Sequence, residues 1–327
     1  MIQEEVGSVM ATTTARTPMG AGAPPAAPQG APWSATIVGL VRRRPVLSFY
    51  ALAFAVSWAG ILLVIGGPRG FPGTPEHVQR LFLPVMLAWL AGPSVAGVVM
   101  TGVVDGRAGY RDLLARMTRW RVGARWYAAA LLTAPLVYLA ASLALALTSS
   151  AFLPGILTAS DTAALLLMGL AYGLLGGGFL EELGWTGFAV PRLRLRHGVF
   201  TTGLLVGVPW GAWHLLQGLW VGGTYAGAIP LALSLLLGFF SGIAELTAYR
   251  VLMVWVYDRT ESLLLAALMH ASLIAGTIFL FTPLAAGVPM VTYSWVFDAA
   301  LWVVVAAVAV ANGGQFTRQP RRRTARR

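Results

Sequence analysis

The feature that most constrains this chain is a series of apolar runs, each about as long as a membrane-spanning helix. Roughly 20 apolar residues in a helix cross the hydrocarbon core of a bilayer. The runs are Val46–Gly66, Leu81–Val104, Trp126–Leu147, Thr162–Leu183, Val199–Trp220, Ile229–Trp255, Ser262–Phe281 and Tyr293–Ala311. Because lipid-exposed backbone must satisfy its own hydrogen bonds, the sequence predicts an all-α integral membrane protein, a bundle of about eight transmembrane helices.

The composition agrees with this fold class. Only 11% of the 327 residues are charged and 57% are hydrophobic, whereas about 25% of the residues of a soluble domain are charged. The chain has no cysteine. A disulfide framework, a thiolate nucleophile and a cysteine-based metal site are therefore excluded.

The positions of the arginines predict the orientation of the helices. The chain has a net charge of +11, and all of its basic residues are arginines that gather between the apolar runs. The main groups are Arg42–Arg44, Arg107–Arg125, Arg192–Arg196 and Arg318–Arg327, with Arg250 and Arg259 bordering the connection after the sixth run. By the positive-inside rule this side, with both termini, is cytoplasmic. We interpret the arginines as contacts to anionic lipid headgroups and not to nucleic acid.

Five segments divide the chain. Residues 1–35 are rich in Ala, Pro, Gly and Thr, and such a segment buries too little apolar surface to fold, so we expect it to be disordered. Residues 36–161 hold three transmembrane helices and an arginine-rich cytoplasmic loop, and residues 162–283 form a helical core. Residues 284–313 hold the last transmembrane helix, and residues 314–327 are a basic tail.

Few ionisable side chains fall inside the runs, and an ionised group in lipid costs several kcal/mol. They include Glu181, Glu182, His214, Glu245, His270 and Asp298. One interpretation is that the paired glutamates lie at the membrane surface and are simply solvated. The other is that glutamate and histidine from three helices converge on one polar cavity, which better explains why three separate spans each place a Glu or a His within the membrane.

Glu181 or Glu182 together with His214 and His270 could perform hydrolysis. A carboxylate in an apolar site can act as a general base toward water, and one histidine can position that water. The second histidine can stabilise the oxyanion of a tetrahedral intermediate. Glu181, His214 and His270 are also a plausible zinc ligand set. The local His-Glu-x-x-His motif is missing, so the sequence leaves a divalent metal open.

Three motifs resemble those of the CPBP family, which contains the CAAX proteases and bacteriocin-processing enzymes of the Abi group. From Glu181 the chain reads EELGWTGFAVPRL, which is similar to the first motif. WGAWH, ending at His214, is similar to the second, and HASLI, beginning at His270, resembles the start of the third. RWRV from Arg119, followed by Trp126, resembles the segment that precedes the core in bacterial members. The resemblance covers roughly residues 105–280 and makes 162–283 the expected catalytic core.

The resemblance implies an eight-helix intramembrane protease that depends on glutamate or on a metal. Glu181 is then the base that activates water, Glu182 supports the site, His214 positions the water and His270 contributes to the oxyanion hole. The chain departs from the family at two positions. Thr186 stands where the family usually has arginine, for which Arg192 is a candidate substitute.

The second departure is Ile274, which stands where the third motif has asparagine. Isoleucine cannot donate a hydrogen bond, so half of the expected oxyanion hole is missing. One lost donor typically costs about 10²–10³ in rate. The sequence therefore also fits a weakened protease or a relative without activity.

Three further predictions concern residues outside the motifs. Glu245 can pair with nearby Arg250, and Asp298 can hydrogen-bond within its own helix. The segment Tyr257–Thr260 is expected to be a turn that caps the seventh helix.

The leading hypothesis is a multi-pass endopeptidase of a bacterial inner or plasma membrane, with its site open toward the cytoplasmic half of the bilayer. Its substrate would be a membrane-delivered peptide, either a prenylated tail or a leader peptide. The alternatives are a peptide-binding scaffold or immunity protein without activity and, third, a proton-coupled transporter. The sequence does not fix the substrate, the metal dependence or the oligomeric state.

Overall fold

The computed structural model describes residues 33–222, 227–283, 285–314 and 316. The predictions of a disordered N-terminal segment and a basic C-terminal tail concern residues that lie almost entirely outside this part of the chain. Within the described residues every regular element is helical. The elements are α1 (Trp33–Arg43), α2 (Pro45–Ile65), η1 (Pro68–Gly70), α3 (Pro75–Met117), α4 (Ala124–Ala146), η2 (Ser150–Phe152), α5 (Gly155–Thr158), α6 (Thr162–Tyr172), η3 (Gly173–Glu181), η4 (Trp185–Ala189), α7 (Val190–Arg194), α8 (Val199–Trp213), α9 (Leu215–Gly222), α10 (Leu231–Thr260), α11 (Leu263–Ile274), η5 (Ala275–Leu280) and α12 (Val288–Ala311).

The predicted all-α membrane bundle is confirmed. Among the described residues, 7 helices are long and apolar enough to cross a membrane. They correspond to all the predicted runs but one, and the exception, Ser262–Phe281, forms the shorter apolar helix Leu263–Thr277. This helix packs against α4, η3 and α10 inside the bundle. Because protein rather than lipid surrounds it, its length need not match the thickness of the bilayer.

Side-chain caps set where several helices begin. The carboxylate of Asp161 accepts a hydrogen bond from the backbone N–H of Ala164 at the start of α6. The hydroxyl of Ser262 does the same for Leu265 at the start of α11. Such caps satisfy N–H groups that have no partner within the helix. The predicted turn at Tyr257–Thr260 is wrong, because α10 continues through these residues and ends only where Glu261 adopts a left-handed φ of 51°.

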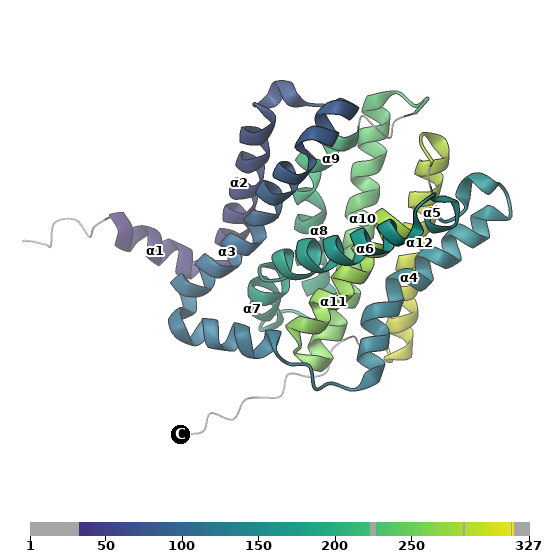
Figure 1. Ribbon diagram of the computed structural model, residues 1–327. Coiled ribbons are helices and arrows are strands. Elements are labelled where there is room, and N and C mark those ends of the chain that lie inside the picture. Colours follow the sequence, from purple (N-terminus) through teal and green to yellow (C-terminus); the bar gives the residue numbers. More distant parts are fainter. Residues whose placement is uncertain (1–32, 223–226, 284, 315, 317–327) are drawn as a thin grey trace, which may run out of the picture.

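The helices place a central group between two flanking pairs (Figure 1). Helices α2 and α3 pack together on one side, and α4 with α12 on the other. Helix α8 packs along α10 in the middle, while α6 passes obliquely across the front of the bundle. Helices α1 and α7 lie toward one end of the bundle and α9 toward the other. The end that carries α1 and α7 is the arginine-rich end, and its cytoplasmic orientation stays a prediction.

Candidate active site

The candidate site begins with an irregularity in the fourth membrane-spanning segment. After α6 the helix widens into π-helical turns over Gly173–Glu181, a feature often found at functional sites. A Cβ on Gly177 would lie 2.1 Å from Cδ1 of Ile274 and 2.6 Å from Nε2 of His270. Only glycine therefore allows α11 to approach closely enough to bring His270 beside the two glutamates.

Glu182 has every oxygen occupied by protein donors. The guanidinium of Arg250 donates from Nη1 to Oε2 and from Nη2 to Oε1, each at 2.9 Å. The Thr186 hydroxyl donates to Oε2, and Nδ1 of His270 donates to Oε1 at 2.8 Å. The carboxylate is buried, with 1% of its surface exposed. With no lone pair left to bind water, Glu182 can support the site but is poorly placed to act as its base.

Arg250 is a further candidate site residue, which the sequence motifs did not single out. Its side chain is fully buried, and its guanidinium carbon lies 3.9 Å from the centre of the Trp210 ring. Its two hydrogen bonds to Glu182 and the cation–π contact with Trp210 hold the guanidinium in one position. The predicted pairing of Arg250 with Glu245 is wrong. An arginine within the predicted span Ile229–Trp255 was itself a sign of a functional site.

Arg250 also supplies the cation that Thr186 cannot. Nη1 of Arg250 lies 3.2 Å from the Thr186 hydroxyl, so its charge occupies the region beside position 186. The suggested substitute, Arg192, is not in this cluster. It pairs with Asp105 and donates to the carbonyl of Phe188 at 2.8 Å. The missing cation is therefore provided by α10 and not by the first motif.

Glu181 differs from its neighbour because only one of its oxygens is bound by indole donors. Oε2 accepts hydrogen bonds from Nε1 of Trp210 at 2.7 Å and Nε1 of Trp185 at 3.2 Å. Oε1 lies 3.9 Å from Nε2 of His270. Glu181 and His270 both line the main cavity. The indoles thus orient the carboxylate while its second oxygen stays near the histidine.

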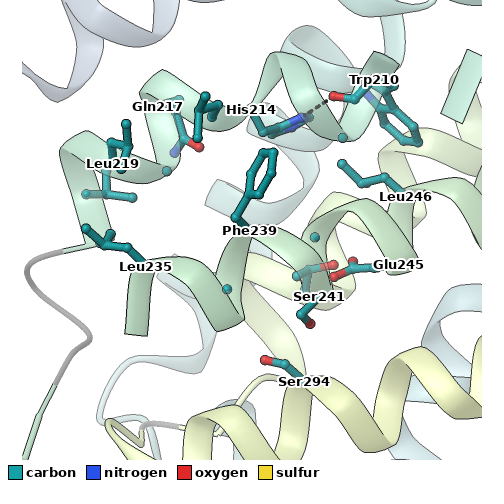
Figure 2. A pocket seen from close by; sticks show the side chains of 18 of the residues that line it. Trp210, His214, Gln217, Leu219, Leu235, Phe239, Ser241, Glu245, Leu246 and Ser294 are labelled. Carbon is teal, nitrogen blue, oxygen red and sulfur yellow. Dashed lines mark hydrogen bonds between the residues drawn. The ribbon is translucent and has the colours of Figure 1, made fainter. Parts of the chain in front are cut away.

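His214 lies where α8 ends and α9 begins. Its Nδ1 donates to the backbone carbonyl of Trp210 at 2.8 Å (Figure 2), which leaves Nε2 as the lone-pair nitrogen of the neutral ring. The rings of Trp89 and Trp213 stand edge-on to the imidazole, at 4.8 and 5.0 Å between centres. The sequence-predicted site residues Glu181, His214 and His270 therefore line one cavity, whereas Glu182 lies behind His270.

The cavity has a volume of about 390 Å³ and a mostly apolar wall. Its lining continues from Glu181 and His270 to Gly222, Leu235 and Gly287, where α9 ends and α10 and α12 begin. The site was expected to open toward the arginine-rich end. In the structure the cavity instead extends toward the opposite end. Toward the arginine-rich side, Arg250 and the residues that bind Glu182 are buried.

Glu181, His214 and His270 are the predicted ligands of a metal ion. Each presents a lone pair to the cavity, which is the chemistry a zinc ligand requires. Within the described residues, however, no three His, Asp or Glu side chains are grouped closely enough to hold one ion. In this arrangement the residues do not fit a metal centre, and the chemistry below uses the protein groups alone.

Ile274 stands where the third motif of the family has asparagine. Ile274 lines the cavity, so an apolar side chain occupies the site of the expected donor. Thr277, one turn further on, also lines it, but its hydroxyl donates to the carbonyl of Leu273 at 2.7 Å. The structure thus gives no direct substitute for the asparagine from α11.

The middle of the chain matches a known protein family. Residues 162–276 match the family described as type II CAAX prenyl endopeptidase Rce1-like. The matched segment runs from the start of α6 into η5 and contains all three motifs and Arg250. No curated protein matches the sequence. The match confirms the resemblance to the CPBP intramembrane proteases that the motifs indicate.

Proposed function

We propose, on the premise that residues 162–276 match the type II CAAX prenyl endopeptidase family, that this chain hydrolyses a peptide bond within the membrane. The single observation that supports this most is the contrast between the two glutamates. Glu182 is saturated by protein donors, while Oε1 of Glu181 remains beside Nε2 of His270 at the cavity. One carboxylate is therefore held as a structural anion and the other is free to act on water.

Glu181 is the general base of the proposed reaction. Oε1 accepts a proton from water, and the water oxygen attacks the scissile carbonyl carbon. The protonated Glu181 then gives that proton to the leaving amine as the carbon–nitrogen bond breaks. Two indole N–H groups hold Oε2 throughout, so the carboxylate does not have to reorient between the two proton transfers.

The two histidines suit different tasks because their Nδ1 partners differ. His214 donates from Nδ1 to the backbone carbonyl of Trp210, and the rings of Trp89 and Trp213 contact its imidazole. Nε2 of the neutral ring is then an acceptor that can position water. His270 donates from Nδ1 to the carboxylate of Glu182, and its Nε2 faces the cavity side of Glu181. When Nε2 also carries a proton, it can donate that proton in a hydrogen bond to the oxyanion. This division agrees with the roles that the resemblance implies.

The charges of the cluster support that assignment. Arg250 forms an ion pair with Glu182, and His270 contacts Glu182 through Nδ1 and lies near Glu181 through Nε2. Buried charges are tolerated when they are paired and hydrogen-bonded. The substrate is proposed to be an apolar, membrane-delivered peptide, since apolar side chains form most of the cavity wall.

A second candidate is a peptide-binding protein of the same fold without activity. The observation that favours it is Ile274, which fills the place of an expected oxyanion donor. Such a protein would bind peptides in the same cavity but leave them intact. The two candidates make opposite predictions for cleavage and the same prediction for binding.

Cleavage by purified protein in lipid nanodiscs, compared with Glu181→Gln, separates the candidates. The glutamine keeps an oxygen for the two indoles but cannot take a proton, so cleavage should fall by about 10²–10⁴. Glu261→Gln is the matched control, because Glu261 is 68% exposed and pairs with Arg119 far from the cavity. A chelator arm tests metal dependence. If wild type and Glu181→Gln bind peptides equally and neither cleaves, the protease proposal is wrong.

A further inference from the structure

The cavity contains a second acidic group that the proposed chemistry does not use. Glu245 of α10 lines the cavity wall, and Figure 2 shows its carboxylate near Ser241 and on the side facing Ser294. Its Oε1 accepts a hydrogen bond from the Tyr138 hydroxyl at 2.9 Å. Asp298 of α12 lies close enough to interact electrostatically with Glu245. Glu245 therefore brings a carboxyl group to the cavity wall, and Asp298 is a second carboxyl group close to it that does not itself line the cavity.

Asp298 is incompletely satisfied. The hydroxyl of Ser241 donates to Oδ2 at 2.6 Å, and the prediction that Asp298 bonds within its own helix is thus wrong. Oδ1 has no hydrogen-bond partner, although the residue is only 3% exposed. A buried acceptor without a donor is unfavourable, and most such atoms in proteins are paired or face a ligand.

No arginine lies beside Glu245 in the described lining of the cavity. The lining includes Glu181 and Glu245 but no arginine, and the chain has no lysine. The nearest arginine on the same helix, Arg250, is committed to Glu182 through both Nη atoms. The described cavity wall is therefore mostly apolar and carries the carboxyl group of Glu245 without a neighbouring arginine.

We propose that Glu245, backed by Asp298, binds a positively charged side chain of the peptide that occupies the cavity. A lysine ammonium fits the observations, because its alkyl chain packs on apolar wall while its N–H groups donate to Glu245. The inference rests on the proposed function only in taking the bound molecule to be a peptide. It holds whether or not the peptide is cleaved.

The spacing along α10 places this group within reach of the scissile bond. Glu245 precedes Arg250 by five residues, which corresponds to about 7.5 Å along the helix axis. An extended peptide advances about 3.3–3.6 Å per residue. A lysine one or two residues from the cleaved bond can therefore reach Glu245 while the carbonyl lies beside Glu181.

Binding to the Glu181→Gln protein in nanodiscs tests the inference without requiring cleavage. The probes are apolar peptides that carry lysine, acetyl-lysine or norleucine at the same position, one or two residues on either side of the expected bond. The lysine peptide should bind about 10-fold more tightly or better at one of these positions, as expected for a charge-assisted hydrogen bond. Adding Glu245→Gln should remove this preference, whereas adding Glu261→Gln should keep it.

The inference is overturned if lysine and norleucine peptides bind equally at every position, or if Glu245→Gln leaves the preference intact. The comparison among peptides needs no Glu245 variant, so it remains decisive if that variant misfolds. A lysine preference without cleavage would contradict the protease proposal and support this one. Cleavage without a lysine preference would do the reverse.

Discussion

The two acidic sites of this molecule are opposites in how their charge is balanced. Glu181 and Glu182 face Arg250 and His270, and every oxygen of Glu182 is bound by a protein donor. Glu245 and Asp298 have only hydroxyl donors from Tyr138 and Ser241, and one Asp298 oxygen has none. A site whose charges are balanced internally is organised before a substrate arrives. A site with unbalanced charge depends on its ligand for compensation.

The largest effect is expected from removing Arg250, the cation that pairs with Glu182. Arg250→Met should destabilise the protein by about 3–5 kcal/mol, because it leaves the buried Glu182 carboxylate without its cation. Cleavage should be lost as His270 shifts with Glu182. Thermal unfolding in detergent and the peptide cleavage assay measure the two effects.

A second substitution checks that the loss concerns charge. Thr186→Arg places a guanidinium where the family usually has one, beside the space that Arg250 vacates. The double variant should therefore regain part of the stability and activity. Arg192→Met is the control, since Arg192 pairs with the partly exposed Asp105 and should cost at most about 1 kcal/mol. If Arg192→Met is as damaging as Arg250→Met, the assignment of the cation is wrong.

A second test introduces the missing oxyanion donor at Ile274. Ile274→Asn introduces an amide donor of similar size at a position that lines the cavity. If a missing donor limits the protein, cleavage should rise by up to about 10²–10³, the usual effect of one donor. The measurement is kcat on the best peptide, with Ile274→Leu as an apolar control. An unchanged kcat in Ile274→Asn would show that the donor is supplied elsewhere.

Close packing between η3 and α11 gives a smaller effect. Gly177→Ala would place a methyl group 2.1 Å from Cδ1 of Ile274 and 2.6 Å from Nε2 of His270. Overpacking of this kind costs about 1–3 kcal/mol and should displace the imidazole from Glu181. Gly39→Ala in α1, where nothing lies within 4 Å, is the matched control and should be neutral or stabilising. A fully active Gly177→Ala protein would contradict the proposed contact between His270 and Glu181.

The sequence was sufficient to predict the helices and the residues of the cavity, but not how their charges pair. Apolar runs define membrane helices because lipid imposes their length, and the exception, α11, is the helix that protein surrounds. Glu181, His214 and His270 could be identified because ionisable groups in apolar helices need a polar environment.

The pairing was not predictable, because it depends on which way each helix is rotated. Arg250 was interpreted as a mark of topology, although it lies inside an apolar stretch of α10, and it pairs with a residue 68 positions earlier. The end of the bundle toward which the cavity extends was not predictable for a similar reason. Which end of a bundle is closed depends on side-chain packing among α3, α8, α10 and α11, which no single run of sequence specifies.

The smallest expected effect comes from removing the carboxylate of the second acidic site, Glu245. Glu245→Gln should change the free energy of unfolding by no more than about 1 kcal/mol, because the Tyr138 hydroxyl can still donate to the amide oxygen. Glu182→Gln should cost about 3–5 kcal/mol, since the buried Arg250 charge would lose its partner. Denaturant unfolding of both variants in the same detergent measures this difference. Equal losses in the two variants would mean that Glu245 already has a balancing charge within the protein, and the distinction between a preorganised site and a ligand-dependent one would then disappear.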